Sequence, residues 1–399
     1  MACPIPQSAL NMIELLNEKG FSAYAVGGCV RDTLMKLTPH DFDLATDALP
    51  EEIKAVFSGC KMVLDGEKHG TVTVIMNHCP VEITTFRRDG DYADHRHPKQ
   101  VSFSKSLSDD LSRRDFTINA MAMDKKGEII DLFGGREDIK AGVIRCVGLP
   151  NQRFEEDALR ILRGLRFSAR LGFAIEQQTA LRMHEKKDLL SFVSRERIQA
   201  ELIGILQGKN AGDILRLYPD ILCAALPGLN HDLSAQALAL DRLSQKTPLL
   251  CLTALLWPLD TGDALQICRH LRLSAKLQQE ISLLLRKKNA LSDVFQVRFL
   301  LSGLGSDLFD GYLLLLQAFG ADPVLMEQAA AEKKRLIEQN ICLNLKNLAI
   351  DGTSLKEIGF TAKSIGMELE KLLFLALTEQ IPNSRDALAA QAEKDFQSS

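Results

Sequence analysis

Hydrophobic and polar positions follow two different periods along this chain. Over about the first 140 residues, short runs rich in β-branched and aromatic residues alternate with segments of helical spacing, of which residues 8–19 are the clearest. The predicted strands cover residues 21–26, 41–45, 71–76 and 81–86. Strands that alternate with amphipathic helices are typical of an α/β unit. We therefore expect a mixed sheet covered by helices in this part of the chain.

The pattern changes near Phe154, where apolar residues begin to recur at helical spacing and strand-like alternation disappears. The predicted helices cover residues 154–171, 196–206, 235–243, 276–285 and 323–339. Proline, which ends helices because it donates no backbone hydrogen bond, occurs at Pro150, Pro227, Pro258 and Pro382. We expect the polar residues from about Gln391 onward to fray. The predicted fold class is α+β, with an N-terminal mixed sheet and helices followed by an all-α C-terminal region.

Composition narrows the class of protein. The 399 residues are 46% hydrophobic, enough for several cores and for two to four domains of about 100–200 residues each. No apolar run approaches the roughly 18 uncharged residues of a membrane span, and the first residues lack the basic and apolar regions of a signal peptide. Nine scattered cysteines without a C-x-x-C pair indicate neither a disulfide framework nor a cysteine zinc site. We expect a soluble, cytoplasmic protein with no membrane partner.

The charge is unevenly distributed. The formal net charge is −4, but the balance is −4 for residues 1–150, +5 for residues 151–300 and −5 for residues 301–399. A local basic face, and not the total, is what attracts phosphate groups. An ordinary solvated helix surface would give the same count, so the motifs must decide.

Two carboxylates are separated by one residue in the predicted strand at 41–45. Side chains alternate along a strand, so Asp41 and Asp43 lie on the same face. Two like charges held this close are costly unless a cation neutralises them, and Mg²⁺ prefers such oxygen ligands. Alone, the pair could also be a solvated strand end. Glu82 in a neighbouring predicted strand is either a third carboxylate of this site or an edge-strand charge that points to solvent.

A glycine pair precedes the carboxylates. Gly27 and Gly28 follow a predicted strand and begin a helix that contains Arg31. Such a turn exposes backbone N–H groups that can hold phosphates, and an arginine adds charge. The alternative is a plain tight turn.

Four motifs together carry a family resemblance. They occur in the order Gly27-Gly28-x-Val30-Arg31-Asp32, Asp41-x-Asp43, Arg113-Arg114-Asp115-Phe116-Thr117-Ile118-Asn119-Ala120 and Glu156-Asp157-Ala158-Leu159-Arg160. In this combination the chain resembles the class II tRNA nucleotidyltransferases (CCA-adding enzymes) and bacterial poly(A) polymerases. The resemblance covers about residues 21–230 closely and the last third only by length and helical character. Residues 89–98 look like the flexible loop of the CCA-adding members, and residues 194–197 look like a late motif of the neck.

The resemblance implies a reaction and the residues that perform it. The tRNA 3′-hydroxyl would attack the α-phosphate of CTP or ATP and release pyrophosphate, with two Mg²⁺ ions bound. No protein partner is implied. The implied catalytic and metal-binding residues are Asp41 and Asp43, and the implied nucleotide-binding residues are Gly28, Arg31, Arg114, Asp157, Arg160, Arg163 and Arg166.

One predicted helix, residues 154–170, would read the base. Asp157 and Arg160 are three residues apart and hence neighbours on one helix face, with Arg163 and Arg166 beside them. Cytosine and adenine share an exocyclic amino group beside an unprotonated ring nitrogen, so one carboxylate and one guanidinium can admit both bases. The alternative is a set of ion pairs on an exposed helix. In company with the other motifs we prefer base recognition.

The resemblance also implies an architecture. It divides the chain into a polymerase-β-like catalytic head (1–140), a helical neck with base recognition (141–206), a helical body (207–280) and a helical tail that binds tRNA (281–399). Three other functions stay open, namely an A-adding or CC-adding specialist, a poly(A) polymerase and a catalytically silent RNA-binding module. The loop at 89–98 disfavours a CC-adding enzyme, and the presence of both Asp41 and Asp43 disfavours a silent one.

Overall fold

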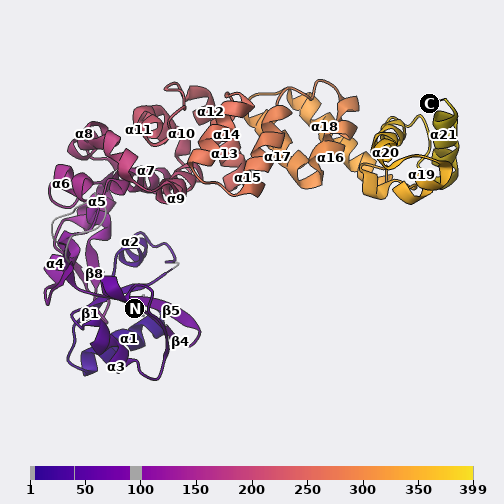
Figure 1. The fold of residues 1–399 in the computed structure, drawn as a ribbon. Helices are drawn as coiled ribbons and strands as arrows, with labels where there is room; N and C mark the ends of the chain where they lie inside the picture. Colours follow the sequence, from indigo (N-terminus) through magenta and orange to yellow (C-terminus); the bar gives the residue numbers. More distant parts are fainter. Residues whose placement is uncertain (1–4, 40, 90–100, 399) are drawn as a thin grey trace. The chain divides into compact units, whose positions relative to one another are not determined.

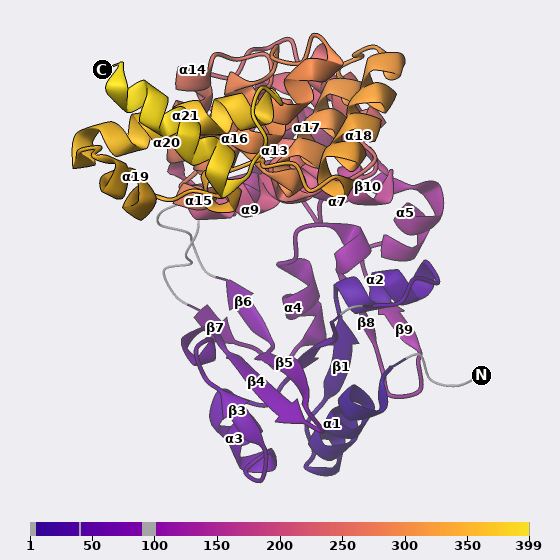
Figure 2. The ribbon, with the colours of Figure 1, turned by 90° about the vertical axis from the view of Figure 1, so that its right-hand side faces the viewer.

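The computed structural model describes residues 5–39, 41–89 and 101–398, and its chain forms two compact units (Figures 1 and 2). The first unit runs to Leu233 and includes His270–Arg272, and the second contains Ser234–Arg269 and everything from Leu273 onward. No helix of the described part is both long and apolar enough to cross a membrane. Most of the expected flexible loop at 89–98 lies outside the described residues.

A seven-stranded mixed sheet forms the base of the first unit, in the order β3-β4-β5-β2-β1-β8-β9 (Figure 2). Its neighbouring strands run antiparallel, except that β2 and β5 are parallel. The strands are β1 (Ala23–Val26), β2 (Asp43–Thr46), β3 (Lys61–Val63), β4 (Thr71–Met76), β5 (Cys79–Thr85), β8 (Met121–Met123) and β9 (Ile129–Asp131). All four strands predicted from the sequence belong to this sheet, and the predicted mixed N-terminal sheet is confirmed.

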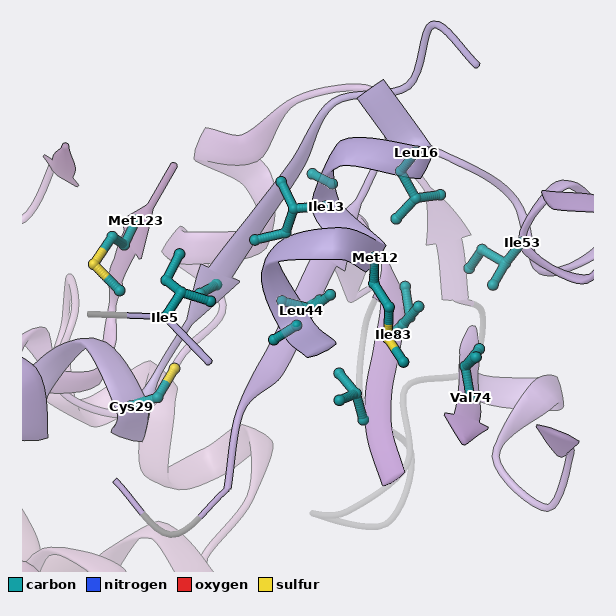
Figure 3. Packing of buried hydrophobic residues seen from close by; sticks show 14 of the residues in the cluster. Ile5, Met12, Ile13, Leu16, Cys29, Leu44, Ile53, Val74, Ile83 and Met123 are labelled. Atoms are coloured by element: carbon teal, nitrogen blue, oxygen red, sulfur yellow. The ribbon is translucent and has the colours of Figure 1, made fainter. Parts of the chain in front are cut away.

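Helices α1 (Gln7–Glu18) and α3 (Pro50–Val56) cover one face of the sheet (Figure 3). Helix α1 presents Met12, Ile13 and Leu16, all fully buried, to strand residues that alternate along the sheet. Burial of this apolar surface is the main stabilising contribution to the sheet, at roughly 25 cal/mol per Å². Because α1 and α3 pack on one face only, the opposite face of the same strands is available for other contacts.

The opposite face carries a smaller apolar cluster and the acidic residues. Val26 and Ala45 pack there with Leu111 of α4 (Leu107–Ser112). Asp43 and Glu82 are register partners in the parallel pair β2–β5, so their side chains point to the same face. A strand pair of three residues each, β6 (Arg87–Asp89) with β7 (Val101–Phe103), lies beside α4.

The remaining helices complete the first unit, with two departures from prediction. The expected continuous helix 154–171 is broken at Asp157, whose backbone is extended (φ −145°, ψ 102°). The Asp157 carboxylate instead accepts the N–H of Leu159 at 3.1 Å, which starts the next helix. Strand structure also persists, because β10 (Val143–Ile144) pairs in parallel with β11 (Ala174–Ile175). The helices are α2 (Gly28–Leu34), α5 (Gly135–Ala141), α6 (Pro150–Glu156), α7 (Leu159–Leu171), α8 (Gln177–Lys186), α9 (Arg195–Leu206), α10 (Ala211–Leu217) and α11 (Pro219–Ala225).

The second unit is helical throughout its described residues, as predicted. Its helices are α12 (Ser234–Arg242), α13 (Pro248–Leu256), α14 (Thr261–His270), α15 (Ala275–Arg286), α16 (Val297–Leu304), α17 (Ser306–Ala318), α18 (Pro323–Glu338), α19 (Gly352–Ile358), α20 (Ala362–Leu377) and α21 (Arg385–Gln397). The expectation of a frayed end from Gln391 is wrong. Leu388 and Ala392 are fully buried in a cluster with α19 and α20, and this packing holds α21 as a helix to Gln397.

Candidate active site

Carboxylates meet where β2 begins. Asp43 is the first residue of β2, Glu82 lies directly beside it on β5, and Asp41 precedes the strand by two residues. Strand β5 is flanked by β4 and β2, so Glu82 is not on an edge strand. The edge-strand position expected for Glu82 is therefore wrong, but its side chain is exposed, and the register places it on the same face as Asp43.

The surroundings of Asp43 are electrostatically unfavourable for its charge. The protein around it removes part of its hydration, and Glu82 and Asp41 repel it, so the pKa of Asp43 is raised although Arg114 opposes the shift. Oxygen donors that repel one another in this way fit a hard divalent cation, whose charge would relieve the repulsion. Within the described ranges, no three acidic, histidine or cysteine side chains converge on one metal position. The oxygen donors thus fit a divalent cation, but the described residues do not bring three such donors to one point.

The glycine pair, Gly27 and Gly28, lies at the start of α2, the helix that carries Arg31. Gly27 has a φ of +79°, a conformation that favours glycine, and a Cβ atom there would lie 3.0 Å from Nη1 of Arg114 and press on that guanidinium. Gly28 then opens α2, which carries Arg31 into the interior. Arg31 donates to Oδ1 of Asn119 at 2.7 Å and to its neighbour Asp32.

Two further arginines are held by one buried carboxylate. Asp110 of α4 is fully buried (0% exposed) and accepts hydrogen bonds from Nη2 of Arg113 at 2.6 Å and from Nη2 of Arg114 at 3.0 Å. Burial alone would raise the pKa of Asp110, but Arg114 and Arg113 outweigh it and hold the pKa below its ordinary value. Asp110 thus fixes both guanidinium groups at the end of α4.

Replacing Asp110 with asparagine should destabilise the fold by about 2 kcal/mol near neutral pH, because two partly buried arginines lose their counter-charge. The pKa of Asp110 is lower in the folded protein than in the unfolded chain. The stabilisation is therefore fully present above the unfolded-state pKa and is lost as the pH falls through the folded-state pKa. The difference between wild type and D110N in urea unfolding should therefore shrink below about pH 4. The control D213N removes an exposed pair with Arg216 and should change stability by less than about 0.5 kcal/mol. Equal D110N differences at pH 7 and pH 3.5 would contradict this account.

Helix α7 adds a basic face whose arginines are also anchored. Nε of Arg163 donates to Oδ2 of Asp115 at 2.7 Å, and Nε of Arg166 donates to Oε2 of Glu201 on α9 at 2.5 Å. Burial alone would raise the pKa of Asp115, but the charges of Arg163 and Arg160 hold this pKa below its ordinary value. Gly204 provides the space, since a Cβ atom there would lie 2.4 Å from Cδ of Arg166.

The predicted base-reading pair is arranged differently from the expectation. Asp157 and Arg160 do not share one helix face, because the break at Asp157 separates α6 from α7. Asp157 instead receives two hydrogen bonds from the guanidinium of Arg197 on α9, at 3.2 and 2.7 Å. Arg160 donates to Oε2 of Glu156 at 2.6 Å and to the carbonyl of Arg113 at 2.9 Å. The expected shared helix face is thus wrong, and each of the two side chains is held by its own partners.

These groups surround one cavity of about 420 Å³. Eight arginines but only three aspartates line it, so a polyanion would find strong positive charge there. The lining residues are Gly27, Gly28, Arg31, Asp43, Arg113, Arg114, Asp115, Asn119, Asp157, Arg160, Arg163, Arg166, Phe167, Arg170 and Arg197. Every predicted site residue is among them except Asp41.

Sequence reasoning gave no site role to several lining residues. Asp115 and Asn119 belong to the motif at 113–120, and Arg197 belongs to the motif at 194–197, so the signal for them was present. Phe167 carried no sequence signal beyond an apolar position on a predicted helix. Its contacts are visible only in three dimensions.

Known proteins match this chain along its length. Two family models match, one described as the Poly A polymerase head domain (residues 23–145) and one as the probable RNA and SrmB-binding site of polymerase A (residues 172–220). A CCA-adding enzyme of Lactobacillus delbrueckii subsp. bulgaricus is 37% identical over 395 residues, which cover 96% of each chain. A CCA-adding enzyme of Ligilactobacillus salivarius is 49% identical over 214 residues, covering 54% of this chain and 52% of that one.

A solved structure agrees with the fold over the whole chain. It is the crystal structure of the Bacillus stearothermophilus CCA-adding enzyme in complex with CTP, with a TM-score of 0.87 and 31% identity, and the match covers 100% of this chain and 99% of that one. The arginine-lined cavity beside the carboxylates, the predicted motifs and this full-length similarity agree. The chain belongs to the CCA-adding enzyme family of the poly(A) polymerase superfamily and is a nucleotidyltransferase.

Proposed function

We propose that this protein adds C, C and A in turn to the 3′ end of tRNA, using CTP and ATP and no nucleic-acid template. The observation that carries the proposal is the cavity in which eight arginines lie next to Asp43, with Asp157 and Arg160 in the same wall. A triphosphate, a base and an attacking hydroxyl each have a chemically suitable partner there. The full-length similarity to a CCA-adding enzyme crystallised with CTP supports the same substrate class.

The chemistry would take place at the carboxylate edge. The tRNA 3′-oxygen forms a bond to the α-phosphorus as the bond between that phosphorus and the β-bridging oxygen breaks, and pyrophosphate leaves while the hydroxyl proton is released. Asp41 and Asp43, with Glu82 beside them, would hold two Mg²⁺ ions. Divalent cations bound there would ease deprotonation of the attacking hydroxyl and offset the charge on the leaving pyrophosphate.

The arginines would hold the triphosphate. Arg31, Arg114, Arg163 and Arg166 all line the cavity, and each is already oriented by a carboxylate or amide partner. Guanidinium groups bind phosphate oxygens in a fixed fork geometry, and prior orientation reduces the entropy lost on binding. The backbone at Gly28, which lines the same cavity, can approach the phosphates because no side chain intervenes.

The base would be selected by Asp157 and Arg160. The carboxylate of Asp157 accepts hydrogen bonds from Arg197 and from the N–H of Leu159, and its two oxygens have capacity for a further donor. That donor would be the exocyclic amino group shared by cytosine and adenine, while Arg160 donates to the adjacent ring nitrogen. Uracil and guanine present the opposite pattern and would be rejected.

An extension assay tests the proposal. The protein is incubated with Mg²⁺, each labelled nucleoside triphosphate and tRNAs that end at the discriminator base, at C or at CC. We expect stepwise addition of C, C and A to the matching ends. Addition of only C or only A would indicate a specialist, long A-tails on unrelated RNA would indicate a poly(A) polymerase, and no extension of any RNA would refute the proposal.

The division into head (1–140), neck (141–206), body (207–280) and tRNA-binding tail (281–399) is part of the same proposal, as is a cytoplasmic location. In this proposal the helical second unit binds parts of the tRNA other than its 3′ end. Basic residues such as Lys287 and Lys346 would contact the tRNA phosphates. Binding of labelled tRNA that weakens steeply with added salt would support phosphate contacts of this kind.

A further inference from the structure

One aromatic ring touches three arginines of the cavity. Phe167 of α7 is 6% exposed and lies in the cavity wall. The guanidinium carbons of Arg31, Arg163 and Arg166 lie 5.4, 5.5 and 4.8 Å from the centroid of its ring. All three distances are within the range of a cation–π contact, about 6 Å. The ring therefore interacts with cations from two different helices, α2 and α7.

Each of these arginines is also held by a second group. Arg31 donates to Asp32 and Asn119, Arg163 donates to Asp115, and Arg166 donates to Glu201. The carboxylate and amide oxygens accept hydrogen bonds from the guanidinium nitrogens, and the aromatic ring contacts the guanidinium groups. The rings of Phe116 and Phe167 form a T-shaped contact with centroids 5.9 Å apart, and Phe116 is fully buried, so Phe167 is also held from the core side.

The physical effect of the ring is to order a cluster of like charges. Three cations around one ring repel one another, and the face of the ring adds an attraction for each guanidinium to that of its polar partner. The negative face of the ring is the feature that attracts the guanidinium groups. Arginine side chains have large rotamer entropy, so fixing them before an anion binds improves affinity for that anion.

We propose that Phe167 is a positioning residue for nucleotide binding, because its ring orders Arg31, Arg163 and Arg166 as a receptor for the triphosphate. This inference rests on the proposed function. Phe167 itself would contact neither the base nor the carboxylates at Asp41 and Asp43. Its loss should weaken CTP and ATP equally and should leave the choice between bases unchanged.

Kinetics of single additions test the proposal with F167L, F167Y and the control F57L. Phe57 is fully buried in the sheet core and does not line the cavity, so F57L reproduces the loss of an aromatic core residue alone. On tRNA ending in C (with CTP) and tRNA ending in CC (with ATP), F167L should raise KM about tenfold for both nucleotides. Its kcat should stay within about threefold of wild type. F167Y, which keeps the ring, should restore KM, and F57L should leave it unchanged.

A second measurement separates the ring's electrostatics from its shape. Phenylalanine at 167 is replaced by analogues with one, two or three ring fluorines, which withdraw negative charge from the ring face and change its size little. The dissociation constant of CTP should rise stepwise with the number of fluorines, whereas a purely structural role would give a constant value. This test also applies if F167L fails to fold.

Three results would overturn the inference: an unchanged KM in a folded F167L, the same KM rise in F57L as in F167L, or no trend with fluorination. A wild-type protein that extends no tRNA would instead refute the proposed function. A wild type that adds C and A, together with F167L that binds CTP normally, would refute the role of Phe167 alone.

Discussion

Replacing Asp43 with asparagine should abolish nucleotide addition, lowering single-turnover rates by about 10³-fold or more. In the proposed function, a cation held by these carboxylates would provide several kcal/mol of transition-state stabilisation, and each 1.36 kcal/mol corresponds to a factor of ten. Burial raises the pKa of Asp43, and repulsion by Glu82 and Asp41 adds to the shift, so Asp43 is close enough to both carboxylates to feel their charge. Addition of A to tRNA ending in CC measures the effect directly.

The loss in D43N should be confined to chemistry. Binding of tRNA should stay within about twofold of wild type, because the tRNA contacts proposed for the second unit are unaffected. The melting temperature without Mg²⁺ should not fall, since the substitution removes one of three mutually repelling charges. Glu51 lies on α3, on the other face of the sheet, and pairs with Lys54 in solvent, so E51Q serves as the matched control with full activity. A D43N variant that keeps a tenth of wild-type activity would refute the assignment.

Local sequence signals located the strand of Asp43 but not its first residue, because Asp41, predicted inside that strand, precedes it and is not placed by strand alternation. The strand that carries Asp43, the turn at Gly27 and the motif at 113–120 each depend on neighbouring residues, and the structure contains all three. The basic middle of the chain was also visible in the charge count, although the total charge is −4. A nucleic-acid or nucleotide partner is therefore better indicated by how charge is distributed than by its sum.

Contacts between distant residues could not be predicted. The apolar spacing of residues 154–171 fits one helix, and no proline or glycine lies near Asp157 to signal a break. The break is stabilised by Arg197, which is 40 residues further along the chain, and periodicity does not contain that information. The same limit applies to the pairing of β10 with β11, and to α21, whose helical end depends on packing against α19 and α20.

The three-dimensional arrangement changes how base selection should be tested. Asp157 does not share a helix face with Arg160, as the sequence suggested, and its carboxylate is held by the forked guanidinium of Arg197. Arg197 also lines the cavity, so its loss would leave the carboxylate without its support at the place where a base would lie. Selection should therefore depend on Asp157, at the break between α6 and α7, and on Arg197 of α9.

Replacing Asp157 with alanine should lower the preference for CTP over UTP by about 100-fold, measured as the ratio of kcat/KM values on tRNA ending in C. A hydrogen bond to a charged group is worth about 1.5–3 kcal/mol, and a site built to pair a polar group discriminates through that pairing. The concentration of Mg²⁺ that gives half-maximal rate should not change in D157A, in contrast to variants of Asp43.

The variant R197K should shift the same ratio by a smaller factor, about tenfold, because lysine keeps the charge but cannot form the two-fold contact to Asp157. Arg195, which starts the same helix and does not line the cavity, provides the control R195K with wild-type selection. In a double-mutant cycle, R197K should add little to D157A, since both changes remove the same oriented carboxylate. Additive effects of the two substitutions, or an unchanged CTP-to-UTP ratio in D157A, would show that the base is read elsewhere.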